Sequence, residues 1–92
     1  MMNEHEYRFV YEKHFKRAYK KLDKQKQDLV DEKLKLMSKN PFHPSLRTKK
    51  LQGTKNTFEA SVTMSIRILW RYADGTIIIL LDMGQHKDIL GV

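Results

Sequence analysis

The strand pattern in the second half of the chain restricts the possible folds most strongly. Apolar and polar residues alternate over 58–62 and again over 66–72, which is the period of a strand with one buried face. Asp74-Gly75 is a strong turn signal, and residues 76–81 after it are continuously apolar or β-branched. We expect the first two segments to pair as a hairpin and the third to form a central strand buried on both sides.

A strand and two helices are predicted before this region. Aromatic residues alternate over 7–11, which indicates a short strand, and apolar residues follow helical spacing over 15–22. Asp23 is a suitable N-cap for a second helix, which Asn40-Pro41 ends. A further short strand is expected at 49–52, closed by a glycine.

This order predicts an α+β fold with an N-terminal strand and a two-helix hairpin packed on one face of a mostly antiparallel four- to five-stranded sheet. The other face of the sheet is expected to stay open. With 92 residues, the chain is expected to form a single domain over residues 1–92.

The composition excludes several kinds of chemistry and indicates where in the cell the protein is expected. The chain has no cysteine, so disulfides, a thiol nucleophile and cysteine metal sites are excluded. The first residues do not resemble a signal peptide, and no apolar run approaches the roughly 18 residues of a membrane span. Histidines are not at ligand spacing with carboxylates, and no glycine-rich phosphate loop is present. We therefore expect a cytoplasmic protein without membrane contact, metal or cofactor.

Positive charge is concentrated in one segment. Between Lys33 and Phe58 the chain has seven basic residues and no carboxylate, while the remainder balances eleven basic residues against eleven acidic ones. A local excess beside short strands predicts a positive face, suited to a phosphate backbone or an acidic partner.

One arginine is expected on the open face of the sheet. By alternation, Arg67 projects opposite Ile66 and Ile68, and so away from the core. Gly84 permits a bend that would place His86 near the edge of that face.

The chain resembles the RelE/ParE superfamily of type II toxin-antitoxin systems. The resemblance rests on the order of the predicted elements and on the stretches 43–53, 58–62, 67–72 and 80–86. It implies an mRNA endonuclease (an mRNA interferase) that cleaves messages on the ribosome and is inhibited by a cognate antitoxin. ParE-type members share the fold and are thought to poison DNA gyrase, so the fold does not decide the function. The implied partners are the antitoxin, mRNA and ribosomal RNA.

The resemblance also implies site residues. Arg67 matches the strand arginine that contacts the scissile phosphate, and His86 matches a C-terminal histidine that acts as acid or base. Lys49 and Lys50 fall where RelE-like toxins have a basic strand, and Arg47 lies just before it. RelE and YoeB have a catalytic tyrosine near the C-terminus, whereas this chain has no aromatic residue after Tyr72. The identity of the general base therefore stays open.

The chemistry independently requires such residues. Metal-free cleavage by the 2′-oxygen needs a base, cations for the added charge on phosphate, and an acid for the departing 5′-oxygen. We expect Arg67, His86, Lys50 and Glu59 to form the catalytic set. The expected RNA-binding residues are Arg47, Lys49, Lys50, Lys55 and Arg71.

Other interpretations remain open at this point. Glu59 is either a general base or a cross-strand charge partner of Arg67 or Arg71. Lys49 and Lys50 are also suited to protect an edge strand from aggregation. His43 is more typical of a turn residue than of a catalyst, and Trp70 is first a core residue. At the level of function, the alternatives are a ParE-like gyrase inhibitor and a catalytically inactive RNA-binding relic.

Overall fold

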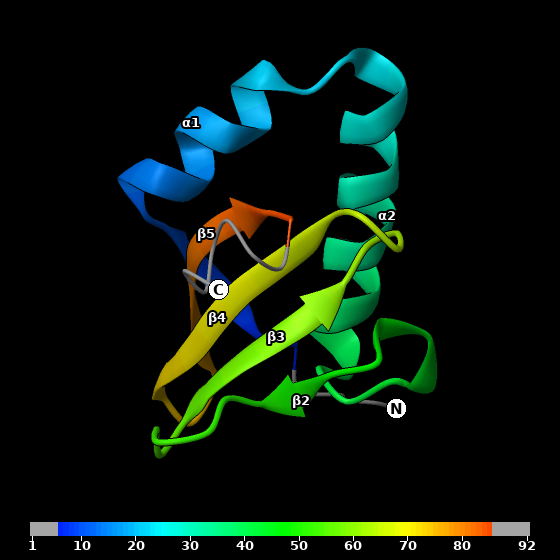
Figure 1. The fold of residues 1–92 in the computed structure, drawn as a ribbon. Helices are drawn as coiled ribbons and strands as arrows, with labels where there is room; N and C mark the ends of the chain where they lie inside the picture. Colours follow the sequence, from blue (N-terminus) through cyan, green and yellow to red (C-terminus); the bar gives the residue numbers. More distant parts are fainter. Residues whose placement is uncertain (1–5, 86–92) are drawn as a thin grey trace.

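The computed structural model describes residues 6–85 of the chain, and His86 lies outside them. Figure 1 shows a sheet with helices packed beside it. The elements are β1 (Arg8–Tyr11), α1 (Lys13–Lys21), α2 (Lys24–Lys39), the 3-10 helix η1 (Pro44–Leu46), β2 (Lys49–Lys50), β3 (Thr57–Ser61), β4 (Arg67–Asp74) and β5 (Ile77–Gly84). Within residues 6–85, neither helix is long and apolar enough to cross a membrane.

The strands form a five-stranded sheet in the order β1-β5-β4-β3-β2. All neighbours pair antiparallel except β1, which runs parallel to β5. The later strands follow one another through short turns, whereas α1 and α2 follow β1 in the chain and separate it from the other strands in sequence. Long helical connections of this kind permit parallel pairing. The predicted α+β fold, with a helix pair and a mostly antiparallel sheet, is confirmed.

The hydrophobic core lies between the helices and one face of the sheet. Phe15 of α1 and Val30, Leu34 and Met37 of α2 are buried, as are Ile68 and Trp70 of β4 and Ile78 and Leu80 of β5. Trp70 stacks on Phe58 with 4.6 Å between ring centroids. Trp70 is fully buried, which confirms it as a core residue.

A bulge in β5 changes which side chains reach this core. Leu69 pairs with Asp82, but the next residue of β4, Trp70, pairs with Leu80, so Leu81 is the extra residue. The shift reverses the alternation, and both Leu80 and Met83 are therefore buried.

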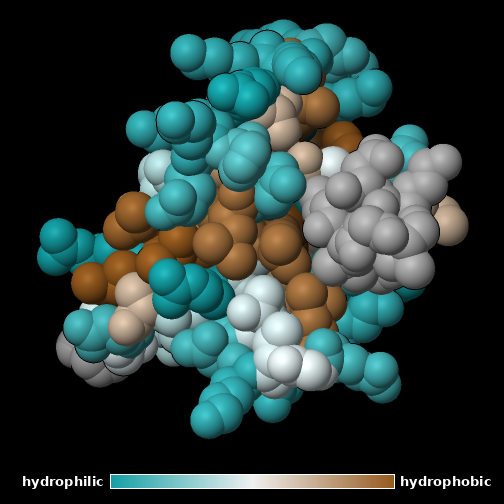
Figure 2. Space-filling view, turned by 60° about the vertical axis from the view of Figure 1, so that its left-hand side comes forward, coloured by the Kyte–Doolittle hydropathy of each residue, from teal (hydrophilic) through white to brown (hydrophobic). Residues whose placement is uncertain are grey.

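The expectation that this strand is buried on both faces is wrong. Ile78 and Leu80 are fully buried, whereas Ile77, Ile79 and Leu81 are only half-buried. Both helices lie on the core side of the sheet, so the outer side chains of β5 receive less cover. Figure 2 shows a band of hydrophobic side chains at the surface between hydrophilic regions.

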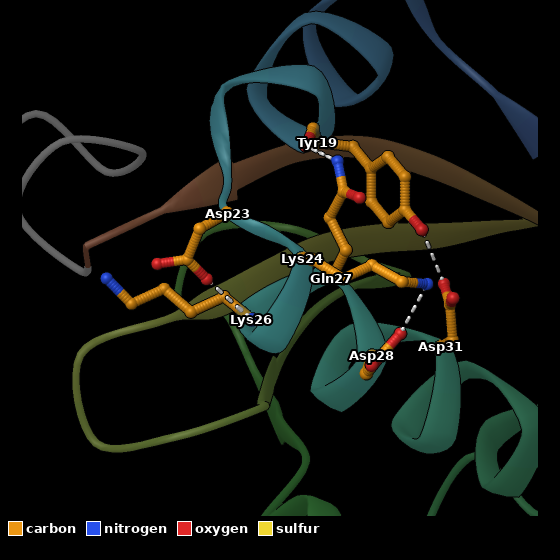
Figure 3. Close-up of polar contacts among 7 residues, drawn as sticks. All are labelled: Tyr19, Asp23, Lys24, Lys26, Gln27, Asp28 and Asp31. Atoms are coloured by element: carbon orange, nitrogen blue, oxygen red, sulfur yellow. Dashed lines mark hydrogen bonds and ion pairs between the residues drawn. The ribbon is translucent and has the colours of Figure 1, made fainter.

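Polar contacts join α1 to α2 (Figure 3). The Tyr19 hydroxyl donates to Asp31 Oδ1 at 2.8 Å, and Gln27 Nε2 donates to the Tyr19 carbonyl at 2.9 Å. The first of these bonds raises the pKa of Tyr19, because the carboxylate stabilises the protonated phenol. At the start of α2, Asp23 Oδ1 accepts from the Lys26 backbone N–H at 2.9 Å, which confirms Asp23 as the predicted N-cap.

Loss of this cap is expected to destabilise the protein. Asp23→Ala leaves a helix N–H without its side-chain acceptor and should lower the free energy of unfolding by about 1 kcal/mol. Asp23→Ser, which retains an acceptor oxygen, is the matched control and should lose less. Urea denaturation followed by circular dichroism measures both values, and equal stability of the alanine and wild-type chains would contradict the assigned cap.

Candidate functional site

The strand register places three charged side chains on the open face. Lys49 pairs with Glu59, and Ser61 pairs with Arg67. Residues directly opposite in a sheet project to the same side, and residues two apart in one strand do so as well. Lys49, Glu59 and Arg67 therefore share the face that the helices do not cover, as predicted for Arg67.

The Arg67 guanidinium is held from two sides. Its Nε and Nη2 donate to the Met64 carbonyl at 3.3 and 3.2 Å, and its Nη1 lies 3.5 Å from Glu59 Oε1. The side chain keeps 23% of its surface exposed. A guanidinium has five N–H donors, so donors on both terminal nitrogens remain for a ligand. Arg67 is a fixed cation with access to solvent.

Glu59 is buried within this group, with 1% of its side chain exposed. Its Oε1 lies 3.5 Å from Arg67 Nη1 and 3.9 Å from Lys49 Nζ. The prediction of a cross-strand charge partner is confirmed for Arg67. A buried carboxylate between two cations orients them and lowers their combined charge.

A shallow cavity of ≈ 390 Å³ opens beside Arg67. Arg47 and Ser45 line it from the loop before β2, and Ser61, Thr63 and Met64 line it from β3 and the turn after it. Arg47 ends η1 in the left-handed region, at φ 49°. The fold thus brings Arg47 to the same cavity as Arg67, twenty residues later in the chain.

The other expected site residues lie elsewhere. Lys50 pairs with Phe58, so it occupies the opposite face of β2 from Lys49 and is not brought to Arg67. Lys55 lies in the β2–β3 turn, at the end of β3 away from Ser61. Arg71 lies two residues after Leu69 in β4. Arg71 is exposed on the open face, about 13 Å from Arg67 at the usual rise of a strand.

His43 has a structural role in the described region. Its Nδ1 accepts from the Ser45 backbone N–H at 3.1 Å and so caps η1. The prediction of a turn residue is confirmed. His86, expected as the acid or base, lies outside the described residues.

The seven basic residues of the charged segment do not form one face. Lys35 and Lys39 are exposed on α2, which packs on the core side of the sheet, and Lys33 Nζ donates to the Ser45 carbonyl at 3.4 Å. Arg47 lines the Arg67 cavity, and Lys49 Nζ lies 3.9 Å from Glu59 Oε1 on the same face. The single positive face predicted from sequence is wrong, because residues that are close in the chain fold onto α2 and onto both faces of β2.

Sequence reasoning missed the turn between β3 and β4. Thr63 Oγ1 accepts from the backbone N–H groups of Ser65 and Ile66 at 3.2 and 3.0 Å. This turn directs the Met64 carbonyl at Arg67. The density of serine and threonine over 61–65 was a usable signal, since their hydroxyls form such local turns.

Solved structures of known proteins share this fold. A RelE–RelB complex from Pyrococcus horikoshii matches with a TM-score of 0.71 and 20% identity, covering 86% of this chain and 93% of that one. A RelBE toxin-antitoxin complex from Mycobacterium tuberculosis matches with a TM-score of 0.71 and 25% identity, covering 88% and 99%. The DinJ–YafQ complex of E. coli matches with a TM-score of 0.75 and 16% identity, covering 94% and 99%.

These likenesses define the structural class of the chain. It has the fold of the RelE/ParE superfamily of type II toxins. No protein-family model and no curated protein matches the sequence. The identity to the solved structures is low, so the fold is shown and the activity is a separate question.

Removing the guanidinium should destabilise the fold. Arg67→Ala takes one cation from buried Glu59, and we expect the free energy of unfolding to fall by about 1–3 kcal/mol. The matched control is Arg71→Ala on the same strand, which should change stability by less than about 0.5 kcal/mol because Arg71 is exposed. Urea denaturation compares the two variants, and equal effects would show that Arg67 and Glu59 do not stabilise each other.

Proposed function

We propose that this chain is the toxin of a type II toxin-antitoxin pair and acts as an mRNA endonuclease on the ribosome. The observation that carries the proposal is Arg67, fixed on the uncovered face of a RelE-like sheet beside a cavity that Arg47 also lines. Two guanidinium groups at one cavity suit a phosphate, which each can bind through paired N–H donors.

In the proposed reaction, the 2′-oxygen of the message attacks the adjacent phosphorus as it loses its proton. The P–O bond to the 5′-oxygen of the next nucleotide breaks, and that oxygen takes up a proton. A 2′,3′-cyclic phosphate and a 5′-hydroxyl result. Arg67 stabilises the extra negative charge on the non-bridging oxygens during this step.

The remaining residues take supporting roles. Arg47 and Lys49 contact the phosphate backbone near the scissile position, and Lys50, Lys55 and Arg71 contact it farther along. Glu59 is a positioning residue, because it lies buried against Arg67. His86 is the proposed acid or base, since imidazole titrates near neutral pH.

A cognate antitoxin is the proposed protein partner. Structural neighbours include the RelBE and DinJ–YafQ toxin-antitoxin complexes of E. coli. The substrate and the ribosome place the proposed activity in the cytoplasm. The proposal would be supported further by a neighbouring open reading frame that encodes a small protein with an acidic helical end.

Primer extension on a message bound to programmed ribosomes tests the activity. The wild-type chain should cleave at the decoding site. Arg67→Lys keeps a positive charge beside Glu59 but removes the planar donors, and we expect about a 10²-fold loss of rate. His86→Ala should lose a similar factor. Lys35→Ala, an exposed change on α2, is the control and should cleave like the wild type.

A different outcome would indicate a different toxin. One structural neighbour is described as a YoeB/ParE toxin from Agrobacterium tumefaciens, and ParE-type action on gyrase needs no cleavage. If the wild-type chain arrests growth without cutting the message, and inhibits DNA supercoiling by purified gyrase, the nuclease proposal is overturned. Harmless overexpression would instead indicate an inactive relic.

A further inference from the structure

A second cluster of positive charge lies on α1, outside the Arg67 site. In its nine residues α1 has four lysines and one arginine and no carboxylate. The total over the whole chain concealed this cluster, because acidic residues elsewhere balance it. Lys13, Arg17 and Lys21 are spaced four residues apart, so they form one row along the exposed side of the helix.

These charges oppose the stability of the helix that contains them. Basic residues in the last turn, Lys20 and Lys21, suit the negative end of the helix dipole. Lys13 and Lys16 lie in the first turn, where the dipole disfavours cations, and like charges four residues apart repel. Within the row, Lys21 suits the dipole and Lys13 does not, while each member repels the next. An external anion would relieve this repulsion.

Glu12 precedes α1 without a side-chain cap hydrogen bond, and three other carboxylates near the helix are engaged in other contacts. Asp31 accepts from the Tyr19 hydroxyl, Asp28 pairs with Lys24 at 3.0 Å, and Asp23 caps α2 (Figure 3). Within residues 6–85, no cation of α1 lies within 4.0 Å of a carboxylate oxygen. The charge of the row is therefore available to a ligand.

A cavity of ≈ 480 Å³ borders this row. Arg17, Lys21 and His14 line it from α1, and Lys26 lines it from the start of α2. Asp82 is the carboxylate in the lining, and its Oδ1 accepts from the Met83 backbone N–H at 2.8 Å. Arg17, Lys21 and Lys26 against one engaged carboxylate leave the cavity positive.

The position of this cavity connects it with Arg67. Ser65, Ile66 and Gly84 also line it, and Gly84 is the register partner of Arg67 in the β4–β5 ladder. The row on α1 and the Arg67 cavity thus meet at the same end of the sheet, on its two sides. A single nucleic-acid strand passing over this end can contact both.

We propose that the row formed by Lys13, Arg17 and Lys21 and the cavity beside it bind a second stretch of RNA phosphates, next to the strand held at Arg67. Lysine predominates in α1, and lysine is depleted at protein–protein interfaces but common where proteins contact phosphate backbones. In Figure 2 the upper part of the surface, where α1 lies, is largely hydrophilic, which fits contact with a solvated polyanion. RNA as the ligand rests on the proposed function.

The test compares two double variants that remove the same charge. Arg17→Ala/Lys21→Ala changes the row, and Lys35→Ala/Lys39→Ala removes two exposed cations, also four residues apart, from α2. The probe is a fluorescein-labelled single-stranded RNA with 2′-O-methyl groups, which bind but cannot be cleaved. Fluorescence anisotropy gives Kd for the full chain over a series of KCl concentrations.

We expect the α1 pair to weaken binding at least about 10-fold and to reduce the slope of log K against log[KCl] by about 1.4, which is roughly 0.7 for each of two phosphates that the variant no longer neutralises. The α2 pair should change Kd less than about twofold. Equal losses in the two pairs, or no loss in the α1 pair, would overturn the inference. The inference would also be overturned if the α1 pair bound RNA like the wild type but lost binding to poly-glutamate. That result would indicate an acidic protein ligand.

This readout is independent of cleavage. If the wild-type chain binds the RNA through α1 but never cuts a message on the ribosome, the proposed nuclease function fails and the inference stands. If cleavage depends on Arg67 but the α1 pair binds like the wild type, the inference fails and the proposed function stands.

Discussion

Backbone pairing of β4 with β3 on one side and β5 on the other determines most of what this molecule presents to its surroundings. Along β4 the side chains alternate between Ile68 and Trp70 in the core and Arg67 and Arg71 on the open face. A slip of one residue would bury the arginines and expose the tryptophan. The burial of Trp70 against Phe58 and the helices therefore also sets the direction of Arg67.

The ion pairs on the open face depend on the register of β2, β3 and β4. Glu59 is almost fully buried on β3, and a buried carboxylate is costly unless cations lie near it. Arg67 and Lys49 supply these cations from the two neighbouring strands. The ion pair and the Met64 carbonyl together fix the guanidinium before a ligand arrives, which reduces the ordering cost of binding a phosphate.

Elements and caps were predictable because they depend on local sequence. Alternation over 58–62 and 66–72, the Asp74-Gly75 turn and the Asp23 cap each appear in the structure within a few residues of their predicted positions. The bulge at Leu81 was not predictable, since a uniformly apolar strand gives no sign of which residue is extra. Its effect is that the outer face of β5 is less covered than its composition suggested.

The residues of the candidate site also divide into those that local sequence predicts and those that the tertiary structure brings together. The sequence by itself determined that Arg67 faces away from the core and that Glu59 lies on the polar face of its strand, because both follow from the two-residue period; the strand register then selected Arg67 as the partner of Glu59. Only the tertiary structure decided that Arg47 joins Arg67, that Lys50 does not, and that α1 carries a separate positive surface. Those outcomes depend on chain reversals and on register between distant segments. The position of a charged residue in the chain does not tell which surface of the folded protein it faces.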